Sequence, residues 1–492
     1  MKFLRWIIIA SLLVGCSTNV PASGVPTLPF ALVTAAPNAS PTPTPFQPIP
    51  WTPTLSLTSD HVTLLTQPTR DTVTPTATLP VPAPTEFPTI DPNLLINTVP
   101  PLPTIDPSGS QILNNGYETV NFLLIGSDRR AGTSFRTDTL VIAILRPNEG
   151  QVSLISIPRD LWVSIPGWEN NRINTVYQHG NAIGYPGGGA GLLKDTILYN
   201  LGIRIDHTAM VEFDGFRRIV DTLGGVDVPV ACAYTDWKLI DPSYNPEIES
   251  NWRLYTVGPG LVHMDGDLAL WYARSRQKSS DFDRGRRQQE VLRALFTQVM
   301  QTGTLARLPE LYNNLKDTVE TDLTLSDLLQ LALYAPKMSN ADIRSYYIRP
   351  PYVHSWITNQ GAYVLSPNQE LLSQLLTEAL SPSTRVAQRQ TIVIEVMNGT
   401  SIPGYEALAA SRLNYAGFET RIVPSDRQDY AHSVLIDKSA MQDRSISDTI
   451  LTVMGMLPGS LIPAPEPTST AHYRLILGYD YQPCFSPEQL TQ

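Results

Sequence analysis

Cysteine is scarce in this chain, with three residues among 492. Three cysteines cannot build the disulfide framework of a small secreted scaffold. Basic residues are also in the minority, with 35 Lys and Arg against 45 Asp and Glu, and the formal net charge is −10. Because general nucleic-acid binding needs a basic surface, we expect no nucleic-acid partner. A site for an anionic group would have to be a local cluster of arginines on an acidic background.

The apolar run at the N-terminus, residues 6–14, is shorter than the roughly 20 residues that a membrane-spanning helix needs. It follows two basic residues and leads into Leu-Val-Gly-Cys at residues 13–16, an order typical of a secretory signal. These four residues resemble a bacterial lipobox, in which the cysteine is acylated. We therefore predict a lipoprotein signal peptide over residues 1–16, with lipidation at Cys16. The alternative is a single uncleaved signal anchor, and both place the rest of the chain outside the cytoplasmic membrane and attached to it.

Proline is concentrated before the first predicted domain. Of 43 prolines, 21 lie between Ser17 and Ser110, among many threonines and serines. Proline lacks a backbone donor and favours extended polyproline II, so this composition indicates a spacer. We predict a disordered Pro/Thr-rich linker over residues 17–115 that holds the globular part away from the membrane.

Short β-branched apolar runs bounded by turn residues then predict strands at residues 120–125, 139–145 and 152–157. Helical spacing predicts helices at 192–200, 215–223 and 283–300, and a further apolar run predicts a strand at 268–273. Strands mixed with helices indicate an α/β or α+β sandwich that ends near residue 385. The glycine-rich run at 186–191 lacks the Lys-Ser/Thr of a P-loop, and we interpret it as a flexible loop.

A second unit follows a Ser/Pro break at residues 381–383. Strands are predicted at 391–397, 419–423, 433–436 and 474–477, with helices at 406–416 and 443–456. This is a small α/β domain, and we interpret it as a binding module because it has no cluster of nucleophile, base or metal ligands.

Charged residues end three of the predicted strands. If the first two strands form a hairpin, Asp128 and Asp138 lie at the same end of the sheet. The third strand returns antiparallel after a four-residue turn and brings Arg159 to that end. Two carboxylates together with substrate phosphates and water are a usual magnesium site. A solvated charged loop is the alternative, but it does not explain why every strand end on this side is charged.

A second group of arginines follows the run at 268–273. Arg274 and Arg276 alternate with Ser275, so in a strand both would point to one face. In the next helix, which Asp281 or Asp283 could cap, stepping back from the apolar stripe places Arg284, Arg287 and Gln288 on the inward face. Anions bind well at a helix N-terminus, and the planar guanidinium makes bidentate contacts to phosphate. The alternative is an internal Arg–Asp salt-bridge network.

These residues resemble those of the LytR-CpsA-Psr family of bacterial cell-envelope proteins. The resemblance is carried in order by residues 122–128 (FLLIGSD), 136–139 (RTDT), 156–160 (SIPRD), 172–174 (RIN), 220–226 (VDTLGGV) and 274–289. It covers about residues 117–299. Residues 396–400 (VMNGT) are similar to the LytR C-terminal domain over a shorter stretch.

The resemblance implies an α/β/α sandwich with a mixed central sheet at residues 116–385, and a LytR C-terminal-like α/β domain at 390–482. It implies a phosphotransferase that moves a glycan from a polyprenyl-pyrophosphate carrier to peptidoglycan or another envelope acceptor, forming a phosphodiester. In the family the two loop aspartates hold Mg²⁺, with Mn²⁺ as an alternative, and arginines grip the pyrophosphate. Here these are Asp128 and Asp138 for the metal, and for the pyrophosphate Arg159, Arg274, Arg276 and Arg284.

Arg136 also matches the family, and Arg287 and Gln288 join the expected pyrophosphate site from their helix face. Asp128, Asp138 and Arg159 are the expected catalytic residues, with either aspartate as the possible base. Two rival functions use the same residues: a pyrophosphatase, and a non-catalytic cell-wall glycan-binding protein. Residues 232–251 form an acidic, aromatic-containing insertion that the family does not match, and the pairing of Cys232 with Cys484 stays open.

Overall fold

The computed structural model describes residues 112–113, 116–128, 137–276, 279–301, 303–383, 392–439 and 444–484. All of these belong to one compact unit. The predicted signal peptide, its lipidation site Cys16 and nearly all of the predicted linker lie outside the described residues. Among the helices described, none combines the length and the apolar character that crossing a membrane would take.

A six-stranded mixed sheet forms the centre of the larger domain, in the order β11-β6-β1-β2-β3-β12. β1 and β3 both pair antiparallel with β2, whereas β6 and β12 run parallel to their neighbours β1 and β3. The three strands predicted from short apolar runs are confirmed as β1, β2 and β3. The strands are β1 (Val120–Ser127), β2 (Thr137–Arg146), β3 (Gln151–Ile157), β6 (His207–Glu212), β11 (Val319–Thr321) and β12 (Ile343–Tyr347).

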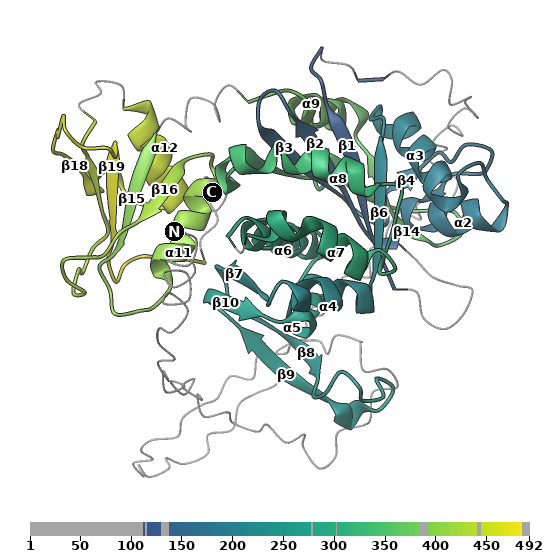
Figure 1. Cartoon of the computed structure of the whole chain (residues 1–492), viewed down its shortest axis with the longest axis horizontal. Helices are drawn as coiled ribbons and strands as arrows, with labels where there is room; N and C mark the ends of the chain where they lie inside the picture. The colour runs from purple at the N-terminus through teal and green to yellow at the C-terminus, as the bar shows by residue number, and fades with distance from the viewer. Residues whose placement is uncertain are drawn as a thin grey trace, which may run out of the picture. The chain divides into compact units, whose positions relative to one another are not determined.

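Helices cover both faces of this sheet, which confirms the predicted α/β/α sandwich (Figure 1). On one face, apolar side chains of α3 (Gly188–Leu201) and α9 (Gln369–Leu380) pack with β1 to β3 in the main core. On the other face, α6 (Asp281–Gln301) packs Leu292 and Phe296 against Val141 and Leu154. The predicted helices at 192–200, 215–223 and 283–300 are confirmed as α3, α4 (Phe213–Thr222) and α6.

Smaller elements surround the sandwich. β7 (Val226–Val230) pairs with β10 (Gly260–Met264), β4 (Trp162–Val163) with β5 (Asn171–Arg172), and β13 (Val353–Ile357) with β14 (Tyr363–Pro367). The other helices of this domain are α2 (Val176–Ala182), α5 (Gly266–Arg274), α7 (Leu308–Leu315) and α8 (Leu325–Ala332).

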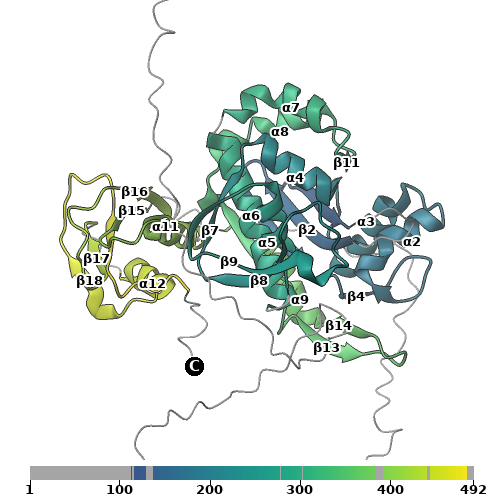
Figure 2. The ribbon, with the colours of Figure 1, turned by 90° about the horizontal axis from the view of Figure 1, so that it is seen from below.

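The insertion at 232–251 contributes to a hairpin, β8 (Tyr234–Leu239) with β9 (Trp252–Val257). The hairpin lies beside α5 in Figure 2, and Trp271 of α5 donates its indole N–H to the carbonyl of Trp237 at 2.8 Å. Tyr255 packs edge-on against the same indole, with ring centroids 5.3 Å apart. The hairpin is therefore anchored on the helix that ends in Arg274.

The glycine-rich run was predicted to be a flexible loop, which is wrong for residues 188–191: a turn occupies 186–187, and α3 begins at Gly188. A Cβ at Gly189 would stand 2.2 Å from the carbonyl oxygen of Tyr177, and one at Gly191 would stand 2.1 Å from that of Pro186. The glycines therefore permit close packing of α3 against α2 and the chain between them.

The strand predicted at 268–273 is also wrong, because these residues lie in the helix α5. Asp265 caps this helix, accepting a hydrogen bond from the Leu268 amide at 2.8 Å. The periodicity of a short apolar run does not distinguish a buried strand from a buried helix. Here the cap at Asp265 marks the start of a helix.

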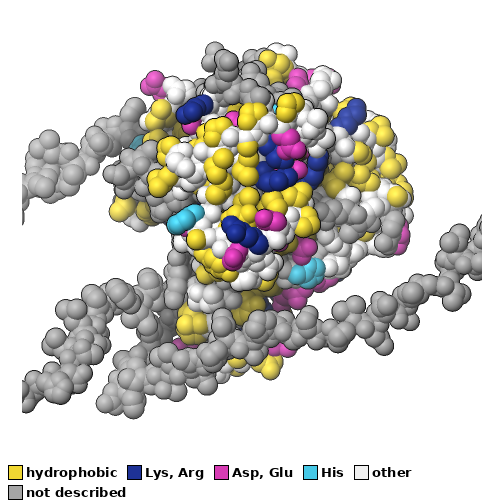
Figure 3. All heavy atoms as spheres, turned by 90° about the vertical axis from the view of Figure 1, so that its left-hand side faces the viewer, with side chains coloured by type: hydrophobic (Ala, Val, Ile, Leu, Met, Phe, Trp, Pro, Cys, Tyr) yellow, Lys and Arg dark blue, Asp and Glu magenta, His cyan; other side chains and the backbone are white. Residues whose placement is uncertain are grey.

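The C-terminal domain has its own sheet, β16-β15-β19-β17-β18, and its own apolar core. Its elements confirm those predicted: β15 (Val393–Asn398), α11 (Tyr405–Tyr415), β16 (Glu419–Ile422), β17 (Val434–Asp437), α12 (Ser445–Met454) and β19 (Tyr473–Leu477). β18 (Leu461–Pro463) adds a strand that was not predicted. On the face shown in Figure 3, Lys and Arg side chains lie beside Asp and Glu rather than in one basic patch.

A disulfide joins Cys232, just before β8, to Cys484 near the C-terminus. This bond settles whether the two cysteines pair, which the sequence left open. The bond spans 252 residues and ties the base of the β8–β9 hairpin to the C-terminal domain. The other cysteine, Cys16, lies outside the described residues.

Candidate functional site

The ends of β1 and β2 bring two aspartates together, as the hairpin argument predicted. Ser127 pairs with Thr137 and Gly126 with Thr139, so Asp138 lies in a one-residue bulge opposite the end of β1. Asp128 follows β1 directly, and both side chains are half-buried. A Cβ at Gly126 would approach Thr139 to 2.9 Å, so glycine permits the close pairing here. Arg136, expected beside them, lies outside the described residues.

Arg159 reaches this edge from the end of β3, as predicted. Its Nη1 lies 3.3 Å from Asp138 Oδ1, and its Nε lies 3.2 Å from Asp281 Oδ2. Asp160 is a third carboxylate, 3.4 Å from the same Nε. Burial lowers the pKa of Arg159, but the charges of Asp138, Asp281 and Asp160 outweigh it and raise the pKa above its usual value. The guanidinium is therefore held charged at the sheet edge.

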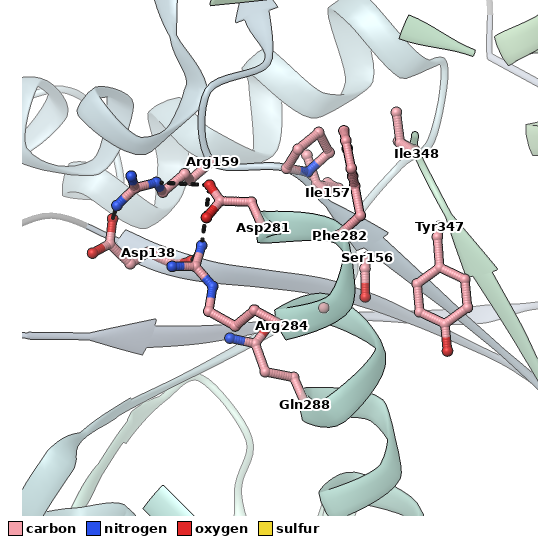
Figure 4. Close-up of a pocket in the computed structure, with 12 residues that line it drawn as sticks. Asp138, Ser156, Ile157, Arg159, Asp281, Phe282, Arg284, Gln288, Tyr347 and Ile348 are labelled. Atoms are coloured by element: carbon pink, nitrogen blue, oxygen red, sulfur yellow. Dashed lines mark hydrogen bonds and ion pairs between the residues drawn. The ribbon is translucent and has the colours of Figure 1, made fainter. Parts of the chain in front are cut away.

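Asp281 is the centre of the site, a role that the sequence did not reveal. Its carboxylate contacts Arg159 at 3.2 Å and Arg284 Nη2 at 3.7 Å (Figure 4). It also lies 3.3 Å from Arg276 Nη1. Burial opposes its charge, yet these three arginines keep its pKa below the usual carboxyl range. The predicted cap of α6 comes from Ser280 instead, whose Oγ accepts from the Asp283 amide at 3.1 Å. Asp281 is thus available to bind arginines.

Arg284 projects from the first turn of α6 toward β2. Its Nη2 lies 3.4 Å from the backbone carbonyl oxygen of Asp138, and its side chain is 8 % exposed. Burial is the largest influence on its pKa and lowers it, whereas the charges of Asp281 and Asp138 oppose that shift. In Figure 4 the guanidinium groups of Arg159 and Arg284 both point toward the Asp281 carboxylate.

Arg274 and Arg276 lie at the end of α5 and just after it. Arg274 is exposed, with its guanidinium 4.3 Å from the ring centre of Phe213. Arg276 is 45 % exposed and bonded to Asp281. The helix ends at Arg274, and Ser275 has an extended ψ of 143°, so the chain turns toward the site after the helix rather than arriving as a strand.

The two other residues predicted on the inward face of α6 have different positions. Gln288 lines the pocket and donates through Nε2 to Thr139 Oγ1 at 2.8 Å and to the Ala273 carbonyl at 3.2 Å. Arg287 does not line it: its guanidinium is fully buried against α5. Each residue turns an α-helix by about 100°, so the neighbours Arg287 and Gln288 point about 100° apart around the axis of α6.

These side chains surround a pocket at the end of the central sheet. It is lined by Asp138, Ser156, Ile157, Pro158, Arg159, Asp281, Phe282, Arg284, Gly285, Gln288, Tyr347 and Ile348. Three guanidinium groups, those of Arg159, Arg276 and Arg284, stand around two carboxylates, those of Asp138 and Asp281. With Asp160 as a third carboxylate beside Arg159, the cluster holds as many carboxylates as guanidinium groups. It also contains the Arg–Asp network that the sequence offered as an alternative.

Among the residues that the structure describes, no three His, Cys, Asp or Glu side chains gather as metal ligands. Asp128 and Asp138 are two carboxylates at one sheet edge, and magnesium in proteins commonly takes its other ligands from phosphates and water. The donor set fits an ion bound together with a phosphorylated substrate. Two histidines of the described residues lie elsewhere: His179 stacks on Trp168 with ring centroids 3.6 Å apart, and His263 Nδ1 lies 2.8 Å from Asp227.

Comparison with known proteins identifies the family that this chain matches. The sequence profile of the LytR_cpsA_psr family matches residues 102–380. A polyisoprenyl-teichoic acid–peptidoglycan teichoic acid transferase, TagU of Oceanobacillus iheyensis, is 30 % identical over 231 residues, 46 % of this chain and 67 % of its own length. The regulatory protein MsrR of Staphylococcus aureus is 28 % identical over 265 residues, 53 % of this chain and 74 % of its own. Among solved structures, Bacillus subtilis TagV matches with a TM-score of 0.44 and 25 % identity, covering 54 % of this chain and 98 % of that one.

Proposed function

The chain belongs to the LytR-CpsA-Psr family, and we propose that it is a glycopolymer phosphotransferase of the cell envelope. It transfers a glycan phosphate from a polyprenyl-pyrophosphate carrier to a hydroxyl of peptidoglycan. The relative named as a polyisoprenyl-teichoic acid–peptidoglycan transferase supports both the carrier and the acceptor. The observation that carries the proposal is the convergence of Arg159, Arg276 and Arg284 on one carboxylate at the sheet end.

The arginine cluster would bind the diphosphate of the carrier. Asp281 holds three guanidinium groups close together before substrate arrives, which reduces the reorganisation needed on binding. Arg274, exposed at the end of α5, adds a fourth positive charge near the pocket. Planar guanidinium groups match phosphate oxygens in pairs, so several of them can grip a diphosphate and stabilise charge that develops on the leaving phosphate.

The transfer step breaks one P–O bond and forms another. The acceptor hydroxyl attacks the phosphorus that bears the glycan, the bond from that phosphorus to the bridging oxygen breaks, and polyprenyl phosphate leaves with the electron pair. The hydroxyl proton passes to a carboxylate, for which Asp138 and Asp128 at the sheet edge are the candidates. These two aspartates would also hold Mg²⁺ or Mn²⁺, which would neutralise phosphate charge when bound.

The full chain, purified in detergent, tests this function with a polyprenyl-pyrophosphate-linked glycan labelled in the sugar and with isolated peptidoglycan. Label should appear in the peptidoglycan, and Arg159→Ala should lower the rate at least about 100-fold, because it removes a charged contact at the reacting phosphates. Arg427→Ala is the matched control, since Arg427 forms an exposed ion pair with Asp429 in the C-terminal domain. Removal of divalent metal should also stop transfer, and Mg²⁺ or Mn²⁺ should restore it.

The same assay separates the rival functions. Free glycan phosphate without labelled peptidoglycan would identify a pyrophosphatase, in which water replaces the acceptor. If the wild-type chain retains the carrier but releases neither product, it is a glycan-binding protein without catalysis.

We also propose that the protein is held at the outer face of the cytoplasmic membrane by acylation of Cys16. The lipobox-like sequence before this residue supports the proposal. Metabolic labelling with a fatty acid should mark the wild-type protein and not Cys16→Ser. Equal labelling of the two would reject the lipid anchor, and membrane retention without any label would favour the signal anchor.

A further inference from the structure

Arg287 lies behind the site, on the side of α6 that faces α5. Its side chain is fully buried, and its guanidinium donates to the backbone carbonyls of Tyr272 and Ser275. The same group contacts Ser279 Oγ at 3.0 Å and Asp283 Oδ2 at 3.2 Å. Each of these hydrogen-bond partners belongs to the chain segment between Tyr272 and the first turn of α6. Arg287 therefore directs these hydrogen bonds to groups of the protein rather than into the pocket.

The carbonyls that Arg287 engages stand at the end of the helix that carries Arg274. The last carbonyls of a helix have no partner within the helix and must be satisfied from outside. Arg287 supplies donors to those of Tyr272 and Ser275, and Gln288 supplies one to that of Ala273 at 3.2 Å. A cation is also favourable at the negative end of the helix dipole. Two consecutive residues of α6 therefore satisfy three carbonyls at the end of α5.

Aromatic side chains enclose the guanidinium. Its central carbon lies 4.1 Å from the ring centre of Tyr234 and 5.4 Å from that of Tyr272. Burial raises the pKa of Tyr234 to about 12, so this ring stays neutral at ordinary pH. Tyr234 is the first residue of β8, and the cation between the rings therefore connects the inserted hairpin to α5 and α6.

We propose that Arg287 is a positioning residue: it fixes the end of α5 so that Arg274 and Arg276 face the pyrophosphate site. Ser275, whose carbonyl it binds, separates these two arginines, and Arg276 reaches Asp281 at 3.3 Å from the segment that Arg287 holds. A planar fork with two terminal nitrogens can bind two carbonyls at once, which a single ammonium cannot do in the same geometry. The positioning role of Arg287 depends on the proposed function in one respect only, namely that the bound anion is a pyrophosphate.

Arg287→Lys tests the positioning role because it retains the charge and removes the fork. Arg286→Lys is the matched control: Arg286 is the preceding residue of the same helix, and it bonds to the α6 side chains Asp283 and Glu290 rather than to the carbonyls at the end of α5. Hydrogen exchange of a peptide over residues 273–276 reports the end of α5, and binding of geranyl diphosphate reports the anion site. Both are measured on the full chain, together with the melting temperature.

In Arg287→Lys, exchange over 273–276 should become about tenfold faster and the Kd for geranyl diphosphate should rise about tenfold, as expected when charge-assisted hydrogen bonds are lost. KM for the carrier substrate should rise more than kcat falls. Arg286→Lys should leave exchange over 273–276 and the Kd unchanged. Wild-type exchange and an unchanged Kd in Arg287→Lys would overturn the proposal, as would a fall in melting temperature with no change in either.

The two proposals can fail separately. If the wild-type chain transfers no glycan, the proposed function fails, while the exchange rate in Arg287→Lys still decides whether this arginine holds the end of α5. If the variant exchanges faster and geranyl diphosphate binds as in the wild type, the positioning role toward the anion is rejected. Arg287→Met, which removes the charge, should be worse than lysine in both measurements, and equality of the two variants would contradict a role for the buried cation.

Discussion

Replacing Asp281 by asparagine removes the carboxylate shared by three arginines and keeps the shape of the side chain. Arg159 lies 3.2 Å from it, Arg276 lies 3.3 Å from it and Arg284 lies 3.7 Å from it. Without this charge the three guanidinium groups repel one another across a small pocket. The change therefore separates the two interpretations of the cluster, a salt-bridge network that only supports the fold and a site prepared for an anion.

The size of the stability loss follows from charge and exposure. Unit charges about 3.5 Å apart interact by about 5 kcal/mol at an effective dielectric constant near 20, before desolvation is subtracted. The Asp281 side chain is 26 % exposed and that of Arg276 is 45 % exposed, so solvent screens much of this. We expect Asp281→Asn to lower the free energy of unfolding by about 2 kcal/mol, which corresponds to a fall in melting temperature of about 4–8 °C.

The loss should depend on pH in a defined direction. Burial raises the pKa of Asp281, but the charges of Arg284, Arg159 and Arg276 lower it by more than burial raises it. The folded pKa therefore lies below that of the unfolded chain. The stabilisation is therefore present above the unfolded pKa, about 4, and is lost as the pH falls through the folded pKa. The difference in melting temperature between wild type and Asp281→Asn should be constant between pH 5 and 7 and should shrink below about pH 4.

Addition of geranyl diphosphate provides the decisive comparison. If the cluster is an anion site, the ligand replaces the missing carboxylate and raises the melting temperature of Asp281→Asn more than that of the wild type, because it relieves repulsion. Asp429→Asn is the control, since Asp429 is 77 % exposed and pairs with Arg427 away from the pocket. No stabilisation of Asp281→Asn by the ligand would refute the reasoning and favour a structural salt-bridge network.

Two other predictions concern the framework of the site. Cys232→Ser should lower the free energy of unfolding by about 2–4 kcal/mol, because Cys232 pairs with Cys484. A reducing agent should lower the melting temperature of the wild type and not of the variant. Equal sensitivity of the two proteins to the reducing agent would contradict the disulfide. Gly189→Ala should cost about 1–3 kcal/mol in chemical denaturation, because its Cβ would meet the Tyr177 carbonyl at 2.2 Å. Gly459→Ala, with no atom within 4 Å of the added Cβ, should cost much less, and similar losses for both would contradict the packing argument.

Sequence patterns predicted the parts of the site that follow from strand pairing. The runs that became β1, β2 and β3 are β-branched and separated by turn residues, so their antiparallel order could be derived. That order alone places Asp138 and Arg159 at one edge, where their side chains lie 3.3 Å apart. The apolar stripe of α6 likewise indicated that Arg284 faces inward, and its side chain is 8 % exposed.

The parts that the sequence did not predict depend on contacts between distant segments. Asp281 suggested only a helix cap, because its partners Arg159 and Arg276 meet it through the fold rather than through a local spacing. Arg287 shares a helix turn with Arg284, but its direction is set by the end of α5, which the sequence assigned to a strand. The wrong assignment of α5 therefore concealed the role of Arg287 as well.

The most direct test of the central claim is the fate of the transferred phosphate in water enriched in ¹⁸O. The wild-type chain is incubated with the polyprenyl-pyrophosphate-linked glycan and peptidoglycan, and the phosphorus products are analysed by mass spectrometry and ³¹P NMR. Transfer predicts a new phosphodiester on peptidoglycan, one polyprenyl phosphate for each glycan moved, and no ¹⁸O in either. Glycan phosphate that carries ¹⁸O, without a phosphodiester on peptidoglycan, would contradict the account.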